Sequence, residues 1–308
     1  MKLPNQVEIR EVGPRDGLQN EAPVPTEAKV RLLDALSETG VRRIEAVSFV
    51  HPKAIPQMAD ADEVWAASKH NPDVRYSALV PNTRGAQRAI AAGFREIEVV
   101  VSASDAHNQA NVNRSTAESL DDIAGLIAMV RADAPGTTVE VIISTSFGCP
   151  YAGDVAPSRV ASIVDRVLAD GADRIAFGDT TGMATPRRVV ELLEAVRSSQ
   201  PALDPLLHFH NTRGTALANL LVAMELGVTQ FDASVGGLGG CPYAPGATGN
   251  VATEEVVHML HDMGIDTGID LAALLRAARL AQDIVGKELP SGVLKAGPRL
   301  PLDHVDHG

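Results

Sequence analysis

The chain has 308 residues, of which 45% are hydrophobic and only 3% aromatic, and its net charge is −12. The length suits an α/β barrel folded as one domain, with a core built from Val, Ile, Leu and Ala. The negative charge argues against nucleic acid and anionic membranes as partners, and no apolar run reaches the length of a membrane span. The sequence begins without an export-signal pattern, and its two cysteines make no disulfide framework, so we expect a cytoplasmic protein.

Strand-like and helix-like segments alternate along the whole sequence. The predicted strands are residues 7–12, 44–47, 75–80, 96–101, 139–144, 174–177, 205–210 and 230–234. The predicted helices are residues 26–38, 59–69, 83–92, 115–132, 158–170, 185–198, 215–226, 252–263 and 271–285. A tail rich in Pro and Gly follows from residue 289.

Several helix boundaries carry their own signals. Ser115 and Glu118 have capping-box spacing. Thr185 precedes a proline at the first helical position, and Thr26 is a plausible N-cap. Four helices end at a glycine that is followed by a short turn and a strand with an apolar start. These glycines are Gly40, Gly93, Gly171 and Gly227.

Eight alternations of strand and helix predict an α/β fold of the (β/α)8 TIM barrel type, with extra C-terminal helices. We expect one domain over residues 1–308, with the barrel at about 7–265 and the C-terminal helix and tail at 266–308. The rival fold, a doubly wound open sheet, usually has a Gly-rich phosphate turn after its first strand. Residues 13–17 (GPRDG) do not fit that turn, and residues 236–241 do not match GxGxxG followed by a helix.

The seventh predicted strand ends with two histidines, His208 and His210. Side chains two positions apart in a strand point to the same face, so these imidazoles could converge on one metal ion. Taken alone, the pair could equally be two hydrogen-bonded core histidines. The residues at the ends of the other strands therefore decide the interpretation.

In a (β/α)8 barrel, chemistry takes place at the C-terminal ends of the strands. Each polar residue there has an ordinary explanation, such as a salt bridge in a turn for Arg15 and Asp16 or a small buried thiol for Cys241. Polar groups gathered at one end of an apolar barrel nevertheless cost free energy unless they are paired or used, which favours a functional site. The residues delivered there are Glu11, Arg15, Asp16, Glu45, Ser48, Asp179, Thr180, His208, His210, Cys241 and Asn250.

The residue types suggest which metal would bind. Two imidazoles, the Asp16 carboxylate and the Asn250 amide form a mixed, rather hard set that lacks the thiolates of structural zinc. Such oxygen-containing sets suit a divalent metal, Mg²⁺ or Mn²⁺, with water or substrate oxygens completing the coordination.

Three stretches of the sequence resemble motifs of the 3-hydroxy-3-methylglutaryl-CoA lyase family. Residues 11–21 (EVGPRDGLQNE) resemble its opening motif, residues 48–60 its second-strand loop and residues 237–250 its cysteine loop. The resemblance covers roughly residues 7–268. It implies a divalent metal held by Asp16, His208, His210 and Asn250, and a reaction site lined by Arg15, Glu45, Asp179 and Cys241.

The resemblance also implies a reaction: metal-dependent retro-Claisen cleavage of 3-hydroxy-3-methylglutaryl-CoA to acetyl-CoA and acetoacetate, as in leucine degradation. The metal would bind the substrate hydroxyl and a carboxylate oxygen. His208 or Asp179 would remove the hydroxyl proton. Arg15 would stabilise the enolate and Cys241 would protonate it.

Other residues have expected supporting roles. Glu11 and Glu45 would orient Arg15 and metal-bound water. The substrate would be a CoA thioester, and its phosphates could meet Lys53 or Arg114. We also expect a homo-oligomer, a dimer, and the apolar helix at residues 271–285 would either cover the barrel or face a partner subunit. The expected substrate-binding residues are Arg15, Gln19, Ser48, Lys53 and Asn113.

The sequence departs from the family pattern near the expected pocket. Residues 210–214 read HNTRG where better-known members read HDTYG, and His51 and Ala54 replace Ser and Trp. Arg213 could pair with a different acyl carboxylate, pair with a CoA phosphate, or lie in solvent. A lyase for a related branched hydroxyacyl-CoA, such as citramalyl-CoA, is therefore an alternative.

Three other classes of protein fit the sequence less well. A Claisen-condensing acyl-CoA synthase would share the barrel and the metal, but it normally carries an additional domain. A Schiff-base aldolase needs a lysine inside the barrel, and no lysine falls on a predicted strand. A silent binding protein would have no reason to hold a base, metal ligands and a thiol together.

Overall fold

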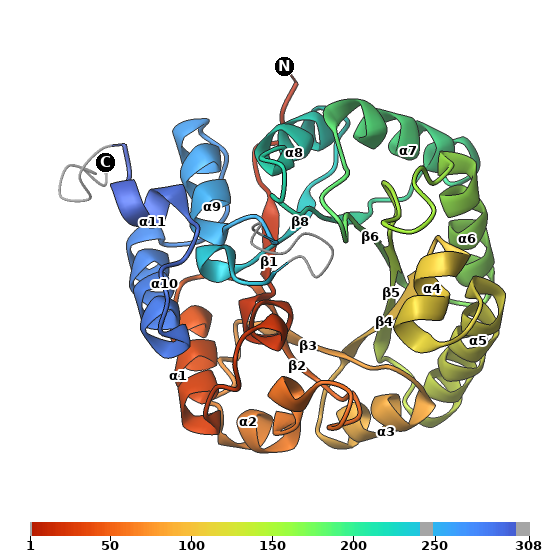
Figure 1. The fold of residues 1–308 in the computed structure, drawn as a ribbon, viewed down its shortest axis with the longest axis horizontal. Coiled ribbons are helices and arrows are strands. Elements are labelled where there is room, and N and C mark those ends of the chain that lie inside the picture. Colours follow the sequence, from red (N-terminus) through yellow and green to blue (C-terminus); the bar gives the residue numbers. More distant parts are fainter. Residues whose placement is uncertain (1, 241–248, 300–308) are drawn as a thin grey trace.

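The computed structural model describes residues 2–240 and 249–299, which form a closed barrel of parallel strands inside a ring of helices (Figure 1). The strands follow one another around the barrel in chain order, and β8 pairs with β1 to close it. This confirms the predicted (β/α)8 fold. The strands are β1 (Glu8–Glu11), β2 (Arg43–Ser48), β3 (Arg75–Leu79), β4 (Glu96–Ser102), β5 (Thr138–Ser144), β6 (Arg174–Gly178), β7 (Leu206–His208) and β8 (Gln230–Ala233).

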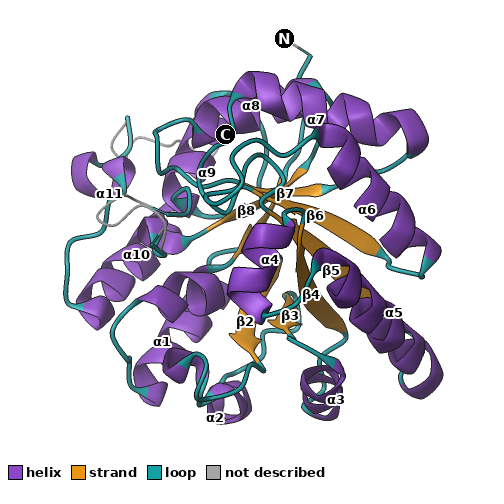
Figure 2. Cartoon of the chain, turned by 45° about the vertical axis from the view of Figure 1, so that its right-hand side comes forward, coloured by secondary structure: helices purple, strands orange, loops and turns teal. Residues whose placement is uncertain are grey.

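Each predicted helix is present, and the described residues also form two short α-helices that were not predicted. The predicted ones are α1 (Thr26–Ser37), α2 (Ala61–Ala67), α3 (Thr83–Ala91), α5 (Thr116–Asp133), α6 (Pro157–Ala169), α7 (Pro186–Ser199), α8 (Ala216–Glu225), α9 (Thr253–Asp262) and α10 (Leu271–Val285). The additional ones are α4 (Asp105–Val112), which lies inside the ring of outer helices near β4 and β5 (Figures 1 and 2), and α11 (Gly292–Ala296).

The C-terminal helices cover the barrel. In Figure 1, α9 and α10 complete the ring of helices between α8 and α1. Helix α10 buries Leu274, Ala278 and Ala281 and packs against α1 and α9. This is the first of the two roles expected for residues 271–285. Among the described residues, no helix is both long enough and apolar enough to cross a membrane.

The helix boundaries agree with the sequence signals except at α1. Ser115 and Glu118 form the predicted capping box, and the Thr185 side chain caps α7. The prediction for Thr26 is wrong, because Pro25 is the N-cap and Thr26 is the first helical residue. The Thr26 hydroxyl instead donates to Asp60 at 2.7 Å, which joins α1 to the start of α2.

The inside of the barrel is charged, which corrects the expectation of an apolar interior. Arg10 on β1 is 1% exposed and donates to Glu98 on β4 at 2.6 Å and to Glu140 on β5 at 2.7 Å. It also donates to both carboxylate oxygens of Asp232 on β8, at 2.7 and 3.0 Å. Because β4 and β5 are not neighbours of β1, these side chains meet across the interior.

A second arginine extends this network. Arg43 on β2 is 2% exposed and lies 3.3 Å from both Glu96 and Glu140, and 3.6 Å from Glu8. The distribution follows from the fold. Successive strand positions face alternately outward, toward the helices, and inward, and on β4 the positions between Glu96, Glu98 and Ser102 hold the buried apolar residues Ile97, Val99 and Val101. Buried charges persist at those inward positions because each has an oppositely charged partner.

We predict that Arg10→Ala strongly destabilises the protein. The substitution leaves three buried carboxylates without their shared cation, a loss that typically costs about 3–5 kcal/mol of unfolding free energy. Urea-induced unfolding followed by circular dichroism measures the loss. The control is Arg187→Ala, which removes an exposed ion pair with Glu191 and should leave the urea midpoint unchanged. An Arg10→Ala variant as stable as the wild type would contradict the prediction.

Candidate active site

The loop after β1 brings Arg15 and Asp16 to the mouth of the barrel. Residues Gly13–Gly17 form one turn of π-helix, η1, in which Gly17 N donates to Val12 O at 3.1 Å. Gly13 is required by close packing, since a Cβ there would lie 2.7 Å from the Glu11 carboxylate. This tight turn directs two consecutive charged side chains into the site.

Glu11 holds backbone segments together and has a different role from the one expected. One carboxylate oxygen accepts from Gly13 N at 2.7 Å and from Val235 N at 2.8 Å, and the other accepts from the Thr253 hydroxyl at 2.6 Å. These bonds join the loop after β1 to the loop after β8 and to the start of α9. Burial raises the pKa of Glu11 to about 7 against these hydrogen bonds. The expected contact with Arg15 is made by Glu45 instead.

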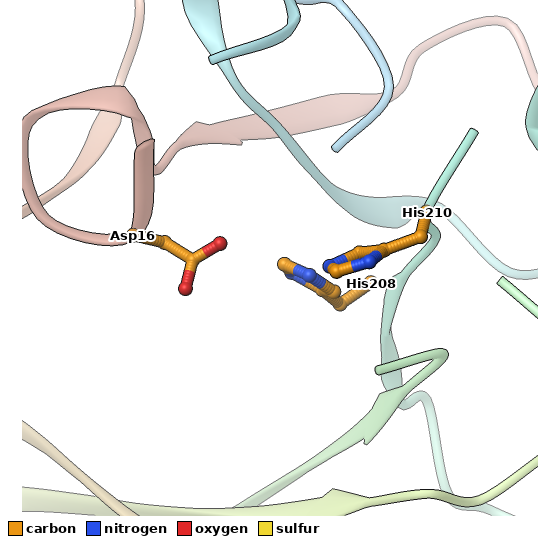
Figure 3. A group of neighbouring side chains, drawn as sticks. All are labelled: Asp16, His208 and His210. Atoms are coloured by element: carbon orange, nitrogen blue, oxygen red, sulfur yellow. The ribbon is translucent and has the colours of Figure 1, made fainter. Parts of the chain in front are cut away.

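Three of the predicted metal ligands come together at the barrel mouth. Asp16 from η1 faces the imidazoles of His208 and His210, which project from the end of β7 (Figure 3). One ligand atom from each residue lies within 4.8 Å of the others, and the imidazole centroids are 5.2 Å apart. In the part of the chain that the structure describes, this is the group of His, Cys, Asp and Glu side chains that fits a metal ion.

Asp16 is held by three donors. One of its carboxylate oxygens accepts from Arg15 and Gln19, each at 2.8 Å, and the other accepts from Asn250 at 2.7 Å. Burial alone would raise the pKa of Asp16, but Arg15, His208 and Asn250 outweigh it and lower the pKa. Asp16 is therefore ionised and fixed in place, as a metal ligand must be.

Asn250 is held beside the Asp16 and histidine side chains by contacts with the surrounding backbone. It forms a β-bridge with His210, and its amide nitrogen also donates to Leu238 O at 3.0 Å. Gly239 makes this approach possible, because its φ is +105° and a Cβ there would lie 2.6 Å from the Asn250 nitrogen. The fourth predicted ligand is thus beside Asp16, with its amide nitrogen facing the carboxylate.

The two histidines lie in different environments. Nδ1 of His208 donates to Asp232 at 3.0 Å, and this carboxylate outweighs the effect of burial and raises the pKa of His208. Burial and the neighbouring His208 lower the pKa of His210 to about 3. Nδ1 of His210 is buried and has no hydrogen-bond partner among the described residues. A neutral imidazole and a fixed carboxylate are the states that bind a cation, so these residues fit a divalent metal.

Arg15 and Glu45 form a buried ion pair next to the group. Arg15 Nε lies 2.6 Å from Glu45, which is fully buried within β2, and Arg15 Nη1 contacts Asp16. Burial raises the pKa of Glu45 despite the Arg15 guanidinium. This ion pair holds the Arg15 guanidinium at the mouth of the barrel, beside the candidate metal ligands.

Asp179 follows β6 and lies at the mouth of the barrel in a buried position. Its Oδ1 accepts from the backbone N–H groups of Met183 and Ala184 at 2.7 and 2.9 Å. Its Oδ2 is buried without a hydrogen-bond partner among the residues described. Burial raises the pKa of Asp179 to about 7, and its backbone N–H donates to His208 O at 2.8 Å, which places it next to the histidines.

The remaining predicted residues are more scattered. Ser48 is buried at the end of β2, with its hydroxyl 3.5 Å from Leu79 O. Lys53 is exposed in the loop after β2. Asn113 ends α4 in the left-handed conformation and accepts from Gln109. Arg114, a candidate for binding the CoA phosphates, pairs with Asp122. Cys241, a predicted catalytic residue, lies outside the described residues.

Arg213 has a contact that none of its expected roles included. Its Nη1 donates to the carbonyl oxygens of Thr181 and Gly182, at 2.7 and 2.9 Å. These residues follow Asp179, so Arg213 joins the loop after β7 to the loop after β6. Its position in the sequence gave no indication of these backbone acceptors.

The fold and site together define a class of protein: a (β/α)8 barrel enzyme with a candidate divalent-metal centre, a buried arginine and a buried carboxylate at the C-terminal mouth. Comparison with known proteins supports this assignment to a class of enzymes. The model of the HMGL-like family matches residues 6–281. The chain belongs to this family and is a carbon–carbon lyase.

Individual relatives cover almost the whole chain. Hydroxymethylglutaryl-CoA lyase of Bacillus subtilis is 47% identical over 94% of this chain and 97% of its own length. (R)-citramalyl-CoA lyase of Chloroflexus aurantiacus is 44% identical, covering 96% of each chain. The structure of an HMG-CoA lyase from Acinetobacter baumannii in complex with coenzyme A and 3-methylmalate superposes with a TM-score of 0.90, at 42% identity and covering 97% of each chain.

We predict that Glu11→Gln changes how stability depends on pH. The folded-state pKa of Glu11 is about 7 and its ordinary value is 4.5, so the folded chain binds this proton more tightly than the unfolded chain. Its contribution to stability is full below pH 4.5 and is lost as the pH rises through about 7. Glutamine does not titrate, so wild-type stability relative to Glu11→Gln should fall over this range.

Urea unfolding of both proteins at a series of pH values measures that difference. The comparison cancels the contributions of other titrating groups, which the two proteins share. A difference that stays constant, or that rises with pH, would contradict the raised pKa of Glu11.

Proposed function

We propose that this protein cleaves 3-hydroxy-3-methylglutaryl-CoA to acetyl-CoA and acetoacetate. The main structural support for this reaction is that Asp16, His208 and His210 converge at the barrel mouth, beside Arg15 and Asp179. The B. subtilis relative supports the substrate, because it is a hydroxymethylglutaryl-CoA lyase that matches nearly the whole chain.

In this proposal, Asp16, His208 and His210 hold one Mg²⁺ or Mn²⁺, and the carbonyl oxygen of the Asn250 amide is the fourth protein ligand. A divalent cation bound there supplies a Lewis acid that lowers the pKa of a substrate hydroxyl. The donor set supports this assignment, since it combines a fixed carboxylate with the His210 imidazole, whose Nδ1 has no hydrogen-bond partner among the described residues.

Asp179 is the better of the two candidate bases. Nδ1 of His208 already carries the proton that it donates to Asp232, and its other nitrogen is needed as a ligand. Oδ2 of Asp179 has no hydrogen-bond partner within the part of the chain that the structure describes, and the pKa of about 7 of this carboxyl suits a group that accepts a proton near neutral pH. Asp179 would take the proton of the substrate hydroxyl, and the C–O bond would become the carbonyl of acetoacetate.

As this carbonyl forms, the adjacent carbon–carbon bond breaks and its electron pair moves onto the thioester fragment as an enolate. Arg15 would stabilise the enolate oxygen, because Glu45 and Asp16 hold its guanidinium in place through Nε and Nη1. Cys241 would then protonate the enolate carbon to give acetyl-CoA. This last role rests on the sequence resemblance, since Cys241 lies outside the described residues.

A second substrate has specific support. The C. aurantiacus relative, a citramalyl-CoA lyase, is 44% identical and covers 96% of this chain. Residues 210–214 also depart from the usual family pattern, and Arg213 there contacts the loop that carries Asp179. The same retro-Claisen chemistry on (R)-citramalyl-CoA would release pyruvate in place of acetoacetate.

Product analysis distinguishes these substrates. The purified protein is incubated with each CoA thioester in the presence of Mg²⁺ or Mn²⁺, and then with a chelator. Metal-dependent release of acetoacetate supports the proposal. Release of pyruvate alone assigns the second substrate, and cleavage of neither compound overturns the proposed reaction. Formation of either thioester from acetyl-CoA would favour the condensing synthase.

We predict that Asp179→Asn lowers kcat about 10²–10⁴-fold, the usual contribution of a general base. The backbone N–H bonds to Oδ1 can be retained by the amide oxygen, so KM should change much less. The matched control is Asp154→Asn, an exposed carboxylate on a neighbouring loop, which should keep wild-type kinetics. An Asp179→Asn variant with wild-type kcat would show that another group accepts the proton.

Other expectations stay predictions. We expect Gln19, Ser48, Lys53 and Asn113 to contribute to substrate binding, with Lys53 or Arg114 meeting the CoA phosphates. A homodimer and a cytoplasmic location are likewise expected from the sequence.

A further inference from the structure

A chain of buried contacts leads from the barrel interior to one of the candidate metal ligands. Arg10 donates to both oxygens of Asp232, at 2.7 and 3.0 Å. The oxygen that accepts at 3.0 Å also accepts from Nδ1 of His208, again at 3.0 Å. The side chain of Arg10 is 1% exposed, that of Asp232 5% and that of His208 14%.

This geometry restricts the tautomer of His208. A carboxylate can only accept a hydrogen bond, so Nδ1 must carry the proton whenever this bond exists. The lone pair of the neutral ring then resides on Nε2. The bond also fixes the ring about its χ2 torsion, which otherwise has a broad, roughly two-fold distribution.

Asp232 is itself fixed. Its two oxygens are engaged by the planar fork of Arg10, a bidentate arrangement that sets the orientation of the carboxylate. Arg10 in turn is anchored by Glu98 and Glu140 on the opposite side of the barrel. The orientation of His208 is therefore determined by side chains on four other strands.

We propose that Asp232, oriented by Arg10, is a positioning residue for the metal site: it holds His208 in the Nδ1-protonated tautomer and so presents Nε2 to the cation. The inference rests on the proposed function, because it takes His208 as a metal ligand. Partners of this kind on metal-bound histidines typically contribute 10–100-fold to metal affinity.

The test measures Mn²⁺ affinity by electron paramagnetic resonance titration of metal-free protein, which needs no substrate. We expect Asp232→Ala to weaken Mn²⁺ binding about 10–100-fold. Asp232→Asn should recover part of this loss, because its amide oxygen can still accept from Nδ1. The control is Asp173→Ala, which removes a carboxylate that pairs with Arg131 just before β6, at the end of the barrel opposite to His208. It should leave the Mn²⁺ affinity within about two-fold of the wild type, since effects through distant partners are small.

A double-mutant cycle shows whether Asp232 acts through His208. In a His208→Ala background, Asp232→Ala should cause little further loss of affinity. An equal loss in both backgrounds would overturn the inference, as would an Asp232→Ala variant with wild-type affinity. Melting temperatures of the metal-free variants verify that each one is folded.

These outcomes separate the inference from the proposed function. If Asp232→Ala binds Mn²⁺ normally while His208→Ala and Asp16→Asn do not, the metal site stands and only the positioning role fails. If the wild-type protein binds no Mn²⁺ at this site, the proposed metal centre fails and the inference fails with it.

Discussion

The pairing of Arg10 with three carboxylates inside the barrel is the interaction on which the rest of the structure depends. Glu98, Glu140 and Asp232 come from three different strands and would be very costly to bury without a cation. With Arg10 between them, the same side chains tie opposite sides of the barrel together. One of them, Asp232, also accepts a hydrogen bond from His208 at the barrel mouth. The ion pairs inside the barrel therefore also set the orientation of the His208 side chain.

A second set of contacts brings distant parts of the chain into the site. Glu11 holds the loop after β1, the backbone at Val235 and the start of α9 through three hydrogen bonds. This arrangement brings Asn250, near the end of the barrel sequence, to within hydrogen-bonding distance of Asp16, near its beginning. The carboxylate of Asp16 therefore accepts hydrogen bonds both from its own loop and from Asn250, which lies more than 200 residues later in the sequence.

Much of this could be predicted from the sequence. The strand ends place Asp16 beside two histidines about 190 positions away, because carboxyl ends of parallel strands meet at one end of a barrel. The interior charges were missed, since an acidic residue in an alternating strand usually indicates a solvated face. In a barrel whose outer face is covered by helices, charges such as Glu98 and Glu140 must point inward. The contacts of Glu11 and Arg213 could not be predicted, because both involve backbone groups of distant loops.

Asp16, His208 and His210 are proposed to form a divalent-metal centre, on which the proposed reaction depends. Anomalous diffraction from crystals soaked in Mn²⁺ tests this metal centre most directly, because the peak locates the ion independently of activity. We expect a single strong peak at the barrel mouth, within coordination distance of Asp16 and both imidazoles. A peak elsewhere, or none in crystals of protein that cleaves its substrate, would contradict it.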